Sequence, residues 1–273
     1  MNCSPQPPES RSLHEVTNAA DYFSRVSDVV REINRTRDPA RAVELLHEAT
    51  LRMGAEVSIF ASFIRDDASC ESYRLLLACD PQWCIQYEQE AWYANDPWLN
   101  YAFHHSEPIR GSEIPVATEA QRSIVQLAER FGFRSTVIMP TPSSGGLSRL
   151  GVLCLGSSTK GYFESEGYVA LKVVARSVAM ELNEWWLARL RDDLVVTTGI
   201  TDADLVLLVH ERQGHSTKEI ARQLATSSGS INSRFQRLNA KLGVPNRKAA
   251  ARLAAEYGLI ESKLQNRRRS VGN

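Results

Sequence analysis

The sequence predicts an α+β domain followed by a smaller all-α domain of four helices. Two patterns predict this: helix and strand signals alternate up to residue 192, and only helical signals follow residue 201. Charge supports the same division, because residues 201–273 contain 13 Lys and Arg against 6 Asp and Glu although the whole chain is neutral. We therefore expect an acidic body and a basic C-terminal part suited to a polyanion.

Helices of the first domain are expected where a capping residue precedes an apolar periodicity. Asp38 and Pro39 begin a helix over 40–53, and Thr118 begins another that ends at Gly132. Further helices are expected over about 81–95 and 97–104. Runs rich in β-branched or apolar residues predict strands at 56–64, 72–79, 108–110, 134–140 and 149–157. Together these elements predict a mostly antiparallel sheet with helices on both faces, an α-β-α sandwich.

A long amphipathic helix is expected over 164–192. Its apolar residues include Val169, Val173 and Leu182 and end near the adjacent pair Trp185 and Trp186. Two interpretations remain open: the helix covers the sheet of its own domain, or part of its apolar stripe forms a dimer seam. A polar break at Thr197-Thr198-Gly199 predicts a linker over 193–200.

Composition excludes several classes of protein. No apolar run approaches the ~18 residues that cross a bilayer, and the N-terminus lacks the basic start and apolar core of a secretory signal. The five cysteines are scattered and lack CxxC spacing, which argues against a zinc site and a disulfide framework. We expect a cytoplasmic protein without a membrane partner, a metal or a cofactor.

The C-terminal region contains four expected helices joined by tight turns, at about 202–212, 217–225, 228–242 and 246–257. Ser216 with Glu219 forms a capping box for the second helix, and Gly243 ends the third. Only a few polar residues separate the second and third helices, which is the spacing of a helix-turn-helix. In that motif the second helix of the pair lies in the major groove of double-stranded DNA.

The third helix presents a basic polar face without any acidic residue, whereas an ordinary solvated bundle would mix both signs. Arg pairs bidentately with guanine, and Ser and Arg hold phosphates. The residues predicted to contact DNA are Thr217, Lys218, Ser228, Ser230, Ser233, Arg234, Arg237 and Lys241.

Three segments of this region resemble the C-terminal domain of LuxR-type regulators. They are Lys218-Glu219-Ile220-Ala221, Lys241-Leu242-Gly243-Val244-Pro245-Asn246-Arg247 and residues 249–253. The resemblance covers nearly all of 201–260 and implies a DNA-binding transcription regulator rather than an enzyme. One departure is Arg234, at a position often held by histidine, which changes the expected DNA preference.

The body resembles the acyl-homoserine-lactone-binding domain of quorum-sensing LuxR proteins. Trp83, Tyr87, Asp96 and Pro97 stand at the spacing of that domain, and the segments at 131–133, 139–141 and 153–155 resemble its strands. The resemblance implies that Trp83 binds a lactone carbonyl, Tyr87 an amide carbonyl and Asp96 an amide N–H, with an apolar pocket for the acyl tail. From the residues alone, Trp83 and Tyr87 also fit core aromatics and Asp96 fits a helix N-cap.

Three positions depart from the family pattern at the predicted pocket. Gly111 replaces a typical tryptophan, Thr136 a typical glycine, and Cys154 a position often held by Ser or Thr. We include all three among the predicted ligand-binding residues, because each change reshapes the pocket wall. The ligand expected from this pocket is an acyl-homoserine lactone, and these departures leave three alternatives open: an unusual acyl-homoserine lactone, a different small molecule, or no ligand.

The two resemblances divide the chain into five parts. These are a disordered tail (1–20), a ligand-sensing and dimerisation domain (21–192), a linker (193–200), a helix-turn-helix DNA-binding domain (201–262) and a basic tail (263–273). The expected function is ligand-gated transcription regulation by a homodimer in quorum sensing. The alternative is a ligand-independent or antagonist LuxR-type regulator, which Gly111 and Thr136 favour. A phosphorylation-controlled regulator needs a receiver domain with parallel β/α alternation, which the body lacks.

Overall fold

The computed structural model describes residues 11–64, 73–89, 92–142 and 149–260. These residues form two compact units, and the main division between them falls between Asn183 and Glu184. The basic tail predicted over 263–273 and the first ten residues of the predicted N-terminal tail lie outside the described residues. No helix in the described part of the chain has the length and apolarity needed to span a bilayer.

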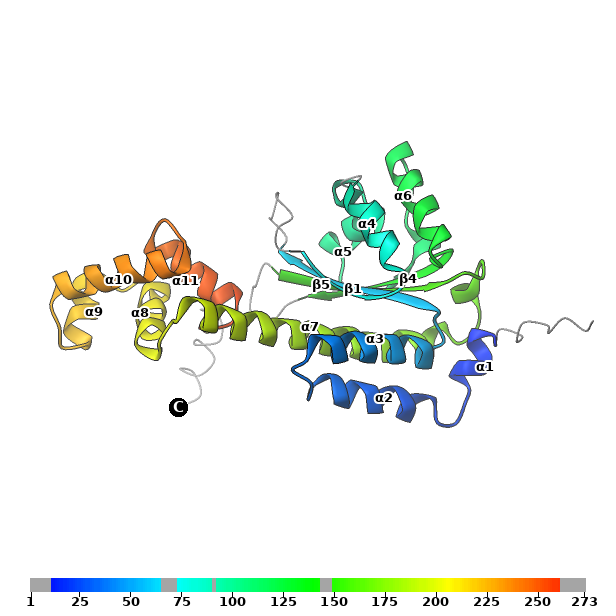
Figure 1. Ribbon diagram of the computed structural model, residues 1–273, viewed down its shortest axis with the longest axis horizontal. Coiled ribbons are helices and arrows are strands. Elements are labelled where there is room, and N and C mark those ends of the chain that lie inside the picture. Colours follow the sequence, from blue (N-terminus) through cyan, green and yellow to red (C-terminus); the bar gives the residue numbers. More distant parts are fainter. Residues whose placement is uncertain (1–10, 65–72, 90–91, 143–148, 261–273) are drawn as a thin grey trace, which may run out of the picture. The chain divides into compact units, whose positions relative to one another are not determined.

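The N-terminal unit is built on a five-stranded antiparallel sheet with the strand order β2-β1-β5-β4-β3 (Figure 1). The strands are β1 (Val57–Ile64), β2 (Arg74–Ala78), β3 (Ile109–Arg110), β4 (Ser135–Pro142) and β5 (Arg149–Ser157). Register places Ile138 of β4 between Ile109 and Cys154. The predicted strands are confirmed to within two residues at each end, except that the predicted start of the second strand at residue 72 lies outside the described residues.

Helices cover both faces of this sheet, as the sequence predicts (Figure 1). On one face lie α4 (Pro81–Gln89), α5 (Pro97–His104) and α6 (Glu119–Arg130). On the other face lie α3 (Pro39–Met53) and the first part of α7 (Tyr168–Thr198), and α2 (Tyr22–Ile33) packs outside α3. Short 3-10 turns span Trp92–Ala94, Gly111–Glu113 and Tyr162–Glu164.

Local capping explains where these helices begin and end. The Asp38 side chain accepts a hydrogen bond from the Ala40 amide, and Gly54 ends α3 at φ 91°. Thr118 and Gln121 form the predicted capping box of α6. Asp96 caps α5, with Pro97 as the first helical residue. The Asp96 cap fixes the start of α5, which contributes Trp98 and Leu99 to a cavity in this unit.

The N-terminus differs from the sequence-based expectation of a disordered tail over 1–20. A short helix, α1 (Leu13–Thr17), begins at a capping box of Ser12 and Glu15. The Leu13 side chain is fully buried, and the Thr17 hydroxyl donates a 2.9 Å hydrogen bond to the Leu13 carbonyl. Burial of this leucine accounts for order that the polar composition of the segment does not predict.

The linker predicted over 193–200 is also replaced by helix, because α7 continues through Thr198. The Thr198 hydroxyl donates a 2.7 Å hydrogen bond back to the Leu194 carbonyl, which accommodates this β-branched residue in a helix. Leu194 and Val195 pack against the core of the C-terminal unit. Gly199, at φ 60°, then ends the helix.

The C-terminal unit contains α8 (Asp202–Gln213), α9 (Thr217–Gln223), α10 (Ser228–Leu242) and α11 (Arg247–Glu256). The four predicted helices are therefore present. Ile220 of α9, Ile231 and Leu238 of α10 and Ala250 of α11 are almost fully buried in one shared core. The turn between α9 and α10 contains Ala225 at φ 49°, the single non-glycine residue with positive φ in the described chain.

Candidate functional site

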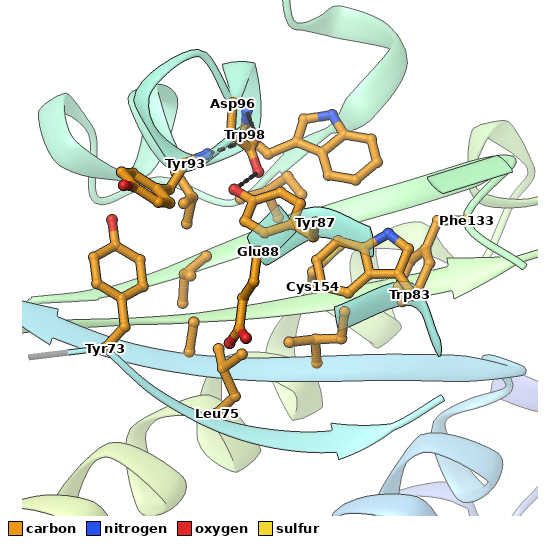
Figure 2. A pocket seen from close by; sticks show the side chains of 15 residues that line it. Tyr73, Leu75, Trp83, Tyr87, Glu88, Tyr93, Asp96, Trp98, Phe133 and Cys154 are labelled. Carbon is orange, nitrogen blue, oxygen red and sulfur yellow. Dashed lines mark hydrogen bonds between the residues drawn. The ribbon is translucent and has the colours of Figure 1, made fainter. Parts of the chain in front are cut away.

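A cavity of about 270 Å³ lies between the sheet of the N-terminal unit and the helices α4 and α5. Its walls are mostly apolar and aromatic. Figure 2 shows Trp83 and Tyr87 on α4, Trp98 on α5, and Phe133 and Cys154 near the sheet. Other lining residues are Ile59, Ala61, Tyr73, Leu75, Glu88, Tyr93, Asp96, Leu99, Ile138 and Val152.

Trp83 contributes a hydrogen-bond donor that has no partner in the described structure. Its side chain is buried, and no described atom accepts a hydrogen bond from Nε1. Helical spacing of four residues places Trp83 beside Tyr87, and their rings stack with centroids 4.7 Å apart. A buried indole N–H without an acceptor is costly, and an acceptor on a bound molecule would relieve that cost.

Asp96 contributes a buried carboxylate to the same cavity, because its position before Pro97 makes it the N-cap of α5. One carboxylate oxygen accepts hydrogen bonds from the Trp98 and Leu99 amides at 2.7 and 3.2 Å, and the other accepts one from the Tyr87 hydroxyl at 2.7 Å. A carboxylate has about four acceptor sites, so one site remains for a ligand donor. Burial raises the pKa of Asp96, although these three hydrogen bonds oppose the rise.

Tyr87 differs in detail from its predicted role as a donor to a ligand carbonyl. Its hydroxyl proton is committed to Asp96, so in this arrangement its oxygen is available only as an acceptor. The sequence places both residues at the site, but it does not show that they bond to each other. This bond orients the Asp96 carboxylate toward the cavity (Figure 2).

Cys154 lines the cavity, whereas Gly111 and Thr136 do not, although all three are predicted ligand-binding positions. Burial, followed by the nearby charge of Asp96, raises the pKa of the Cys154 thiol well above its ordinary value. Cys154 therefore faces the cavity as a neutral thiol. Cys79, Cys84 and Cys154 are free thiols, while Cys3 and Cys70 lie outside the described residues.

Gly111 and Thr136 instead pack against each other where β3 ends beside β4. A Cβ atom added to Gly111 would come within 1.8 Å of Thr136 Oγ1 and 3.4 Å of Trp98 Nε1. A large side chain at position 111 therefore cannot coexist with Thr136 in its present place. The two departures noted in the sequence are coupled by this steric exclusion.

The predicted DNA-contacting residues divide into two groups on the surface of α9 and α10. Lys218, Ser228, Ser233 and Arg237 are exposed, and Ser230 is half-buried. In the described structure no hydrogen bond or ion pair joins the side chain of any of these five residues to another helix. The Ser230 backbone amide donates to the Ser227 side chain that caps α10. Ser233 and Arg237 are four residues apart and share one face of α10.

Three other predicted residues make contacts within the C-terminal unit. Arg234 donates a 3.0 Å hydrogen bond to the Ala203 carbonyl, and Lys241 forms an ion pair with Asp204 at 3.1 Å. Thr217 accepts a 3.0 Å hydrogen bond from Arg247. Burial opposes ionisation of Asp204, but hydrogen bonds from Thr201 and Lys241 outweigh it and lower the Asp204 pKa. Arg234 and Lys241 thus tie α10 to the start of α8, which the sequence does not predict.

The described residues contain no group of three His, Cys, Asp or Glu side chains arranged to hold a metal ion. Sequence reasoning missed Glu88, Tyr73 and Tyr93 in the cavity lining. Glu88 directly follows Tyr87 on α4, so helical geometry alone indicates that it lies near the cavity edge. Tyr73 and Tyr93 give no comparable signal, because their approach depends on how β2 and a 3-10 turn pack.

Two family models match the chain. The Autoinducer binding domain matches residues 38–169, and the model of bacterial regulatory proteins of the luxR family matches residues 207–254. The first match contains the cavity, and the second contains α9 and α10. Comparison with curated protein sequences gives no significant match.

Solved structures with the same fold include SdiA in complex with octanoyl-rac-glycerol, with a TM-score of 0.68 and 17% identity over 89% of this chain and 98% of that one. SdiA of Escherichia coli in another crystal structure gives a TM-score of 0.68 and 18% identity over 88% and 99% of the two chains. A third structure is that of CepR2 from Burkholderia cenocepacia, an N-acylhomoserine lactone dependent LuxR family transcription factor. It gives a TM-score of 0.53 and 15% identity over 63% of this chain and 99% of that one. The chain is a LuxR-family DNA-binding regulator with an autoinducer-binding domain, and it is not an enzyme.

Proposed function

We propose that this protein is a ligand-gated transcription regulator whose cavity binds a neutral acylated signal, an acyl-homoserine lactone or a related molecule. The observation that carries the proposal is the unpartnered Trp83 Nε1 beside the buried Asp96 carboxylate in an otherwise apolar cavity. Pockets of this kind, with few polar groups in an apolar wall, bind small amphiphilic molecules.

The polar groups of the cavity specify the head group of such a ligand. Trp83 donates one hydrogen bond, and Asp96 accepts one, so the head group needs an acceptor and a donor close together. A lactone with an amide linkage has both, and so does an acylglycerol with its ester and hydroxyl groups. CepR2 is N-acylhomoserine lactone dependent, and SdiA has been solved in complex with octanoyl-rac-glycerol, so both head groups are associated with proteins of this fold.

The DNA-binding part of the proposal assigns reading of the major groove to α10. Ser233 and Arg237 present free polar groups on one exposed face, and Arg237 has the chemistry to pair with guanine. Ser228, Ser230 and Lys218, with Thr217 at the start of α9, are assigned to phosphate contacts. Arg234 and Lys241 remain candidate DNA contacts only if they leave their partners on α8.

We include a homodimer in the proposal because α7 exposes an apolar stripe in the N-terminal unit. Val169, Val173 and Met180 are 76%, 55% and 39% exposed, and their spacing places them on one side of the helix. Val174, Val178 and Leu182 on the other side are buried, so both interpretations of this helix from the sequence have support. A two-fold dimer would match a two-fold operator. The free thiols fit the cytoplasmic location expected from the sequence.

The second candidate is a regulator that binds DNA without any ligand. The close packing of Gly111 and Thr136 favours this second candidate. It leaves no room at position 111 for the pocket tryptophan that the family resemblance implies. The cavity favours the first candidate, because neither residue fills it. The two candidates make opposite predictions about ligand.

Thermal unfolding of the full chain tests the ligand proposal. Octanoyl-homoserine lactone and octanoylglycerol are added separately to the purified protein, with octanoic acid as the anionic control. We expect at least one neutral compound to raise the melting temperature in a concentration-dependent way, since a ligand that binds only the folded state stabilises it. No shift with either neutral compound, over a panel of acyl lengths, would reject the proposed ligand class.

A further inference from the structure

The cavity contains a second acidic side chain, Glu88, which the site described above does not use. Glu88 lies on α4 next to Tyr87 and is exposed, so it marks the place where the cavity meets solvent. Figure 2 shows its carboxylate directed away from Asp96 and toward Leu75 of β2. The two acids therefore lie at different ends of one ligand site.

Glu88 has little local reason to be acidic. No ion pair to it is found among the described residues, and its one described side-chain hydrogen bond is donated by the Cys84 thiol to Oε1 at 3.6 Å. A thiol is a weak donor, and it can also bond to the side-chain oxygen of a glutamine. Leu75, toward which the carboxylate is directed in Figure 2, is apolar. A charge at this position does not serve the packing of α4.

The rest of the lining adds no positive charge to balance Glu88. Among the described residues that line the cavity, the charged ones are Asp96 and Glu88, and none is Lys, Arg or His. Low-dielectric aromatic walls strengthen the field of a charge at the mouth of a cavity. An anionic chain end near Glu88 is therefore repelled, a plain alkyl end gains nothing from it, and a hydrogen-bond donor or a cation is attracted.

We propose that Glu88 is a specificity-determining residue and that the ligand carries a second donor, a hydroxyl or an amine, on the part of its chain that lies near α4. The proposal rests on the proposed function, since it concerns the same cavity. It extends that function by requiring a ligand that is polar at both ends and not anionic at either.

Binding of matched acyl-homoserine lactones measures this preference. Butanoyl, hexanoyl and octanoyl chains are each prepared with a methyl, an amine or a carboxylate end, and dissociation constants are measured by calorimetry on the full chain. For the wild-type protein, the comparison is made at the chain length whose end lies nearest Glu88. There we expect the amine-ended lactone to bind about two- to fivefold more tightly than the methyl-ended one, and the carboxylate-ended lactone to bind more weakly than the methyl-ended one by a similar factor. The preference shrinks as salt is raised.

Glu88→Gln and Glu129→Gln form a matched pair of variants. Glu129 is an exposed acid on α6 that does not line the cavity. We expect Glu88→Gln to remove the preference for amine over carboxylate, and Glu129→Gln to behave as wild type. The thiol contact of Cys84 persists with glutamine, so the variant should retain its melting temperature.

The outcomes separate this proposal from the function on which it rests. If methyl-ended lactones bind and Glu88→Gln does not alter the order of the chain ends, the role of Glu88 is wrong and the ligand proposal stands. If no lactone in the series binds wild type and octanoylglycerol does not raise the melting temperature, both are wrong. An equal loss of preference in Glu129→Gln would assign the effect to overall charge and also overturn the role of Glu88.

Discussion

The indole of Trp83 is the residue whose replacement most directly probes the ligand site. Trp83→Phe removes an N–H that bonds to nothing in the described structure, so the loss of this group should not weaken the fold. We expect the dissociation constant of the bound acylated compound to rise about fivefold, because a hydrogen bond in a buried site contributes about 1 kcal/mol. Calorimetric titration measures the change.

Phe133→Leu is the matched control for this variant. Phe133 lines the same cavity, is 2% exposed and has no polar group. Phe133→Leu loses an amount of packing comparable to that lost in Trp83→Phe. A smaller effect of Phe133→Leu on ligand affinity would therefore isolate the contribution of the indole N–H. Equal losses of affinity in the two variants would contradict the role given to Trp83.

Asp96 should make the stability of the protein depend on pH in a defined direction. Burial raises its pKa in the folded state, so on raising the pH the unfolded chain loses this proton first. The free energy of unfolding therefore falls between the unfolded and folded pKa values and stays lower above them. Asp96→Asn keeps an N-cap of equal quality and removes the titration.

Urea unfolding between about pH 4 and pH 7 compares wild type with Asp96→Asn. We expect the stability of the variant relative to wild type to increase as the pH rises through this range. A difference that does not change with pH, or that decreases, would show that Asp96 does not titrate with a raised pKa.

At the scale of single residues, the sequence predicts which residues line the cavity better than it predicts how they contact one another. Trp83, Tyr87, Asp96 and Cys154 do line one cavity, because helical spacing and the N-cap before Pro97 are local. The Tyr87–Asp96 bond and the steric exclusion between Gly111 and Thr136 depend on how separate elements pack. No local pattern contains that information.

The turn between α9 and α10 offers a test at the scale of elements. Ala225 adopts φ 49°, in the left-handed region where a Cβ atom is unfavourable and glycine is not. Ala225→Gly should stabilise the C-terminal unit by about 0.5–1 kcal/mol, as the relieved strain exceeds the added chain entropy. Gly214, at φ 84° with no atom near an added Cβ, is the reciprocal control, and Gly214→Ala should cost about 1 kcal/mol. A lower free energy of unfolding for Ala225→Gly, measured by chemical unfolding, would contradict the claim that this turn is strained.

The two basic residues of α10 should differ in their effects on DNA. Arg237 is exposed, whereas Lys241 is paired with Asp204 and bonds to the Gly199 carbonyl. We expect Arg237→Gln to weaken binding to a specific duplex by about 1–3 kcal/mol. Lys241→Gln should lower stability by at most about 1 kcal/mol and change DNA affinity less. Fluorescence anisotropy with a labelled duplex distinguishes them, and a larger loss of affinity for Lys241→Gln would reverse the assignment.

Element boundaries follow the sequence wherever a cap is encoded locally. The capping boxes at Thr118 and Ser216 and the glycines Gly54 and Gly243 fix helix ends that the sequence predicts. The end of α7 does not follow its polar signal, because Leu194 and Val195 bury against the C-terminal core and hold the helix past the threonines. Tertiary burial outweighs local propensity at that point.

At the scale of the whole molecule, the proposed dimer depends on the exposed stripe of α7. Val173→Glu places a charge in the centre of that stripe and should shift the chain toward monomer, since a buried unpaired charge at an interface is costly. Light scattering after size exclusion measures the mass. The exposed Glu129→Gln serves as a surface control, and an unchanged dimer in Val173→Glu would place the seam elsewhere.

Ligand control of DNA binding is the central claim, and one measurement tests it most directly. The dissociation constant of the full chain for a specific duplex is measured at fixed salt, with and without a saturating concentration of the neutral acylated compound that raises the melting temperature. We predict a change of at least about fivefold, in the range of ordinary allosteric coupling. Equal affinity in both conditions would contradict the claim and favour a regulator that binds DNA regardless of ligand.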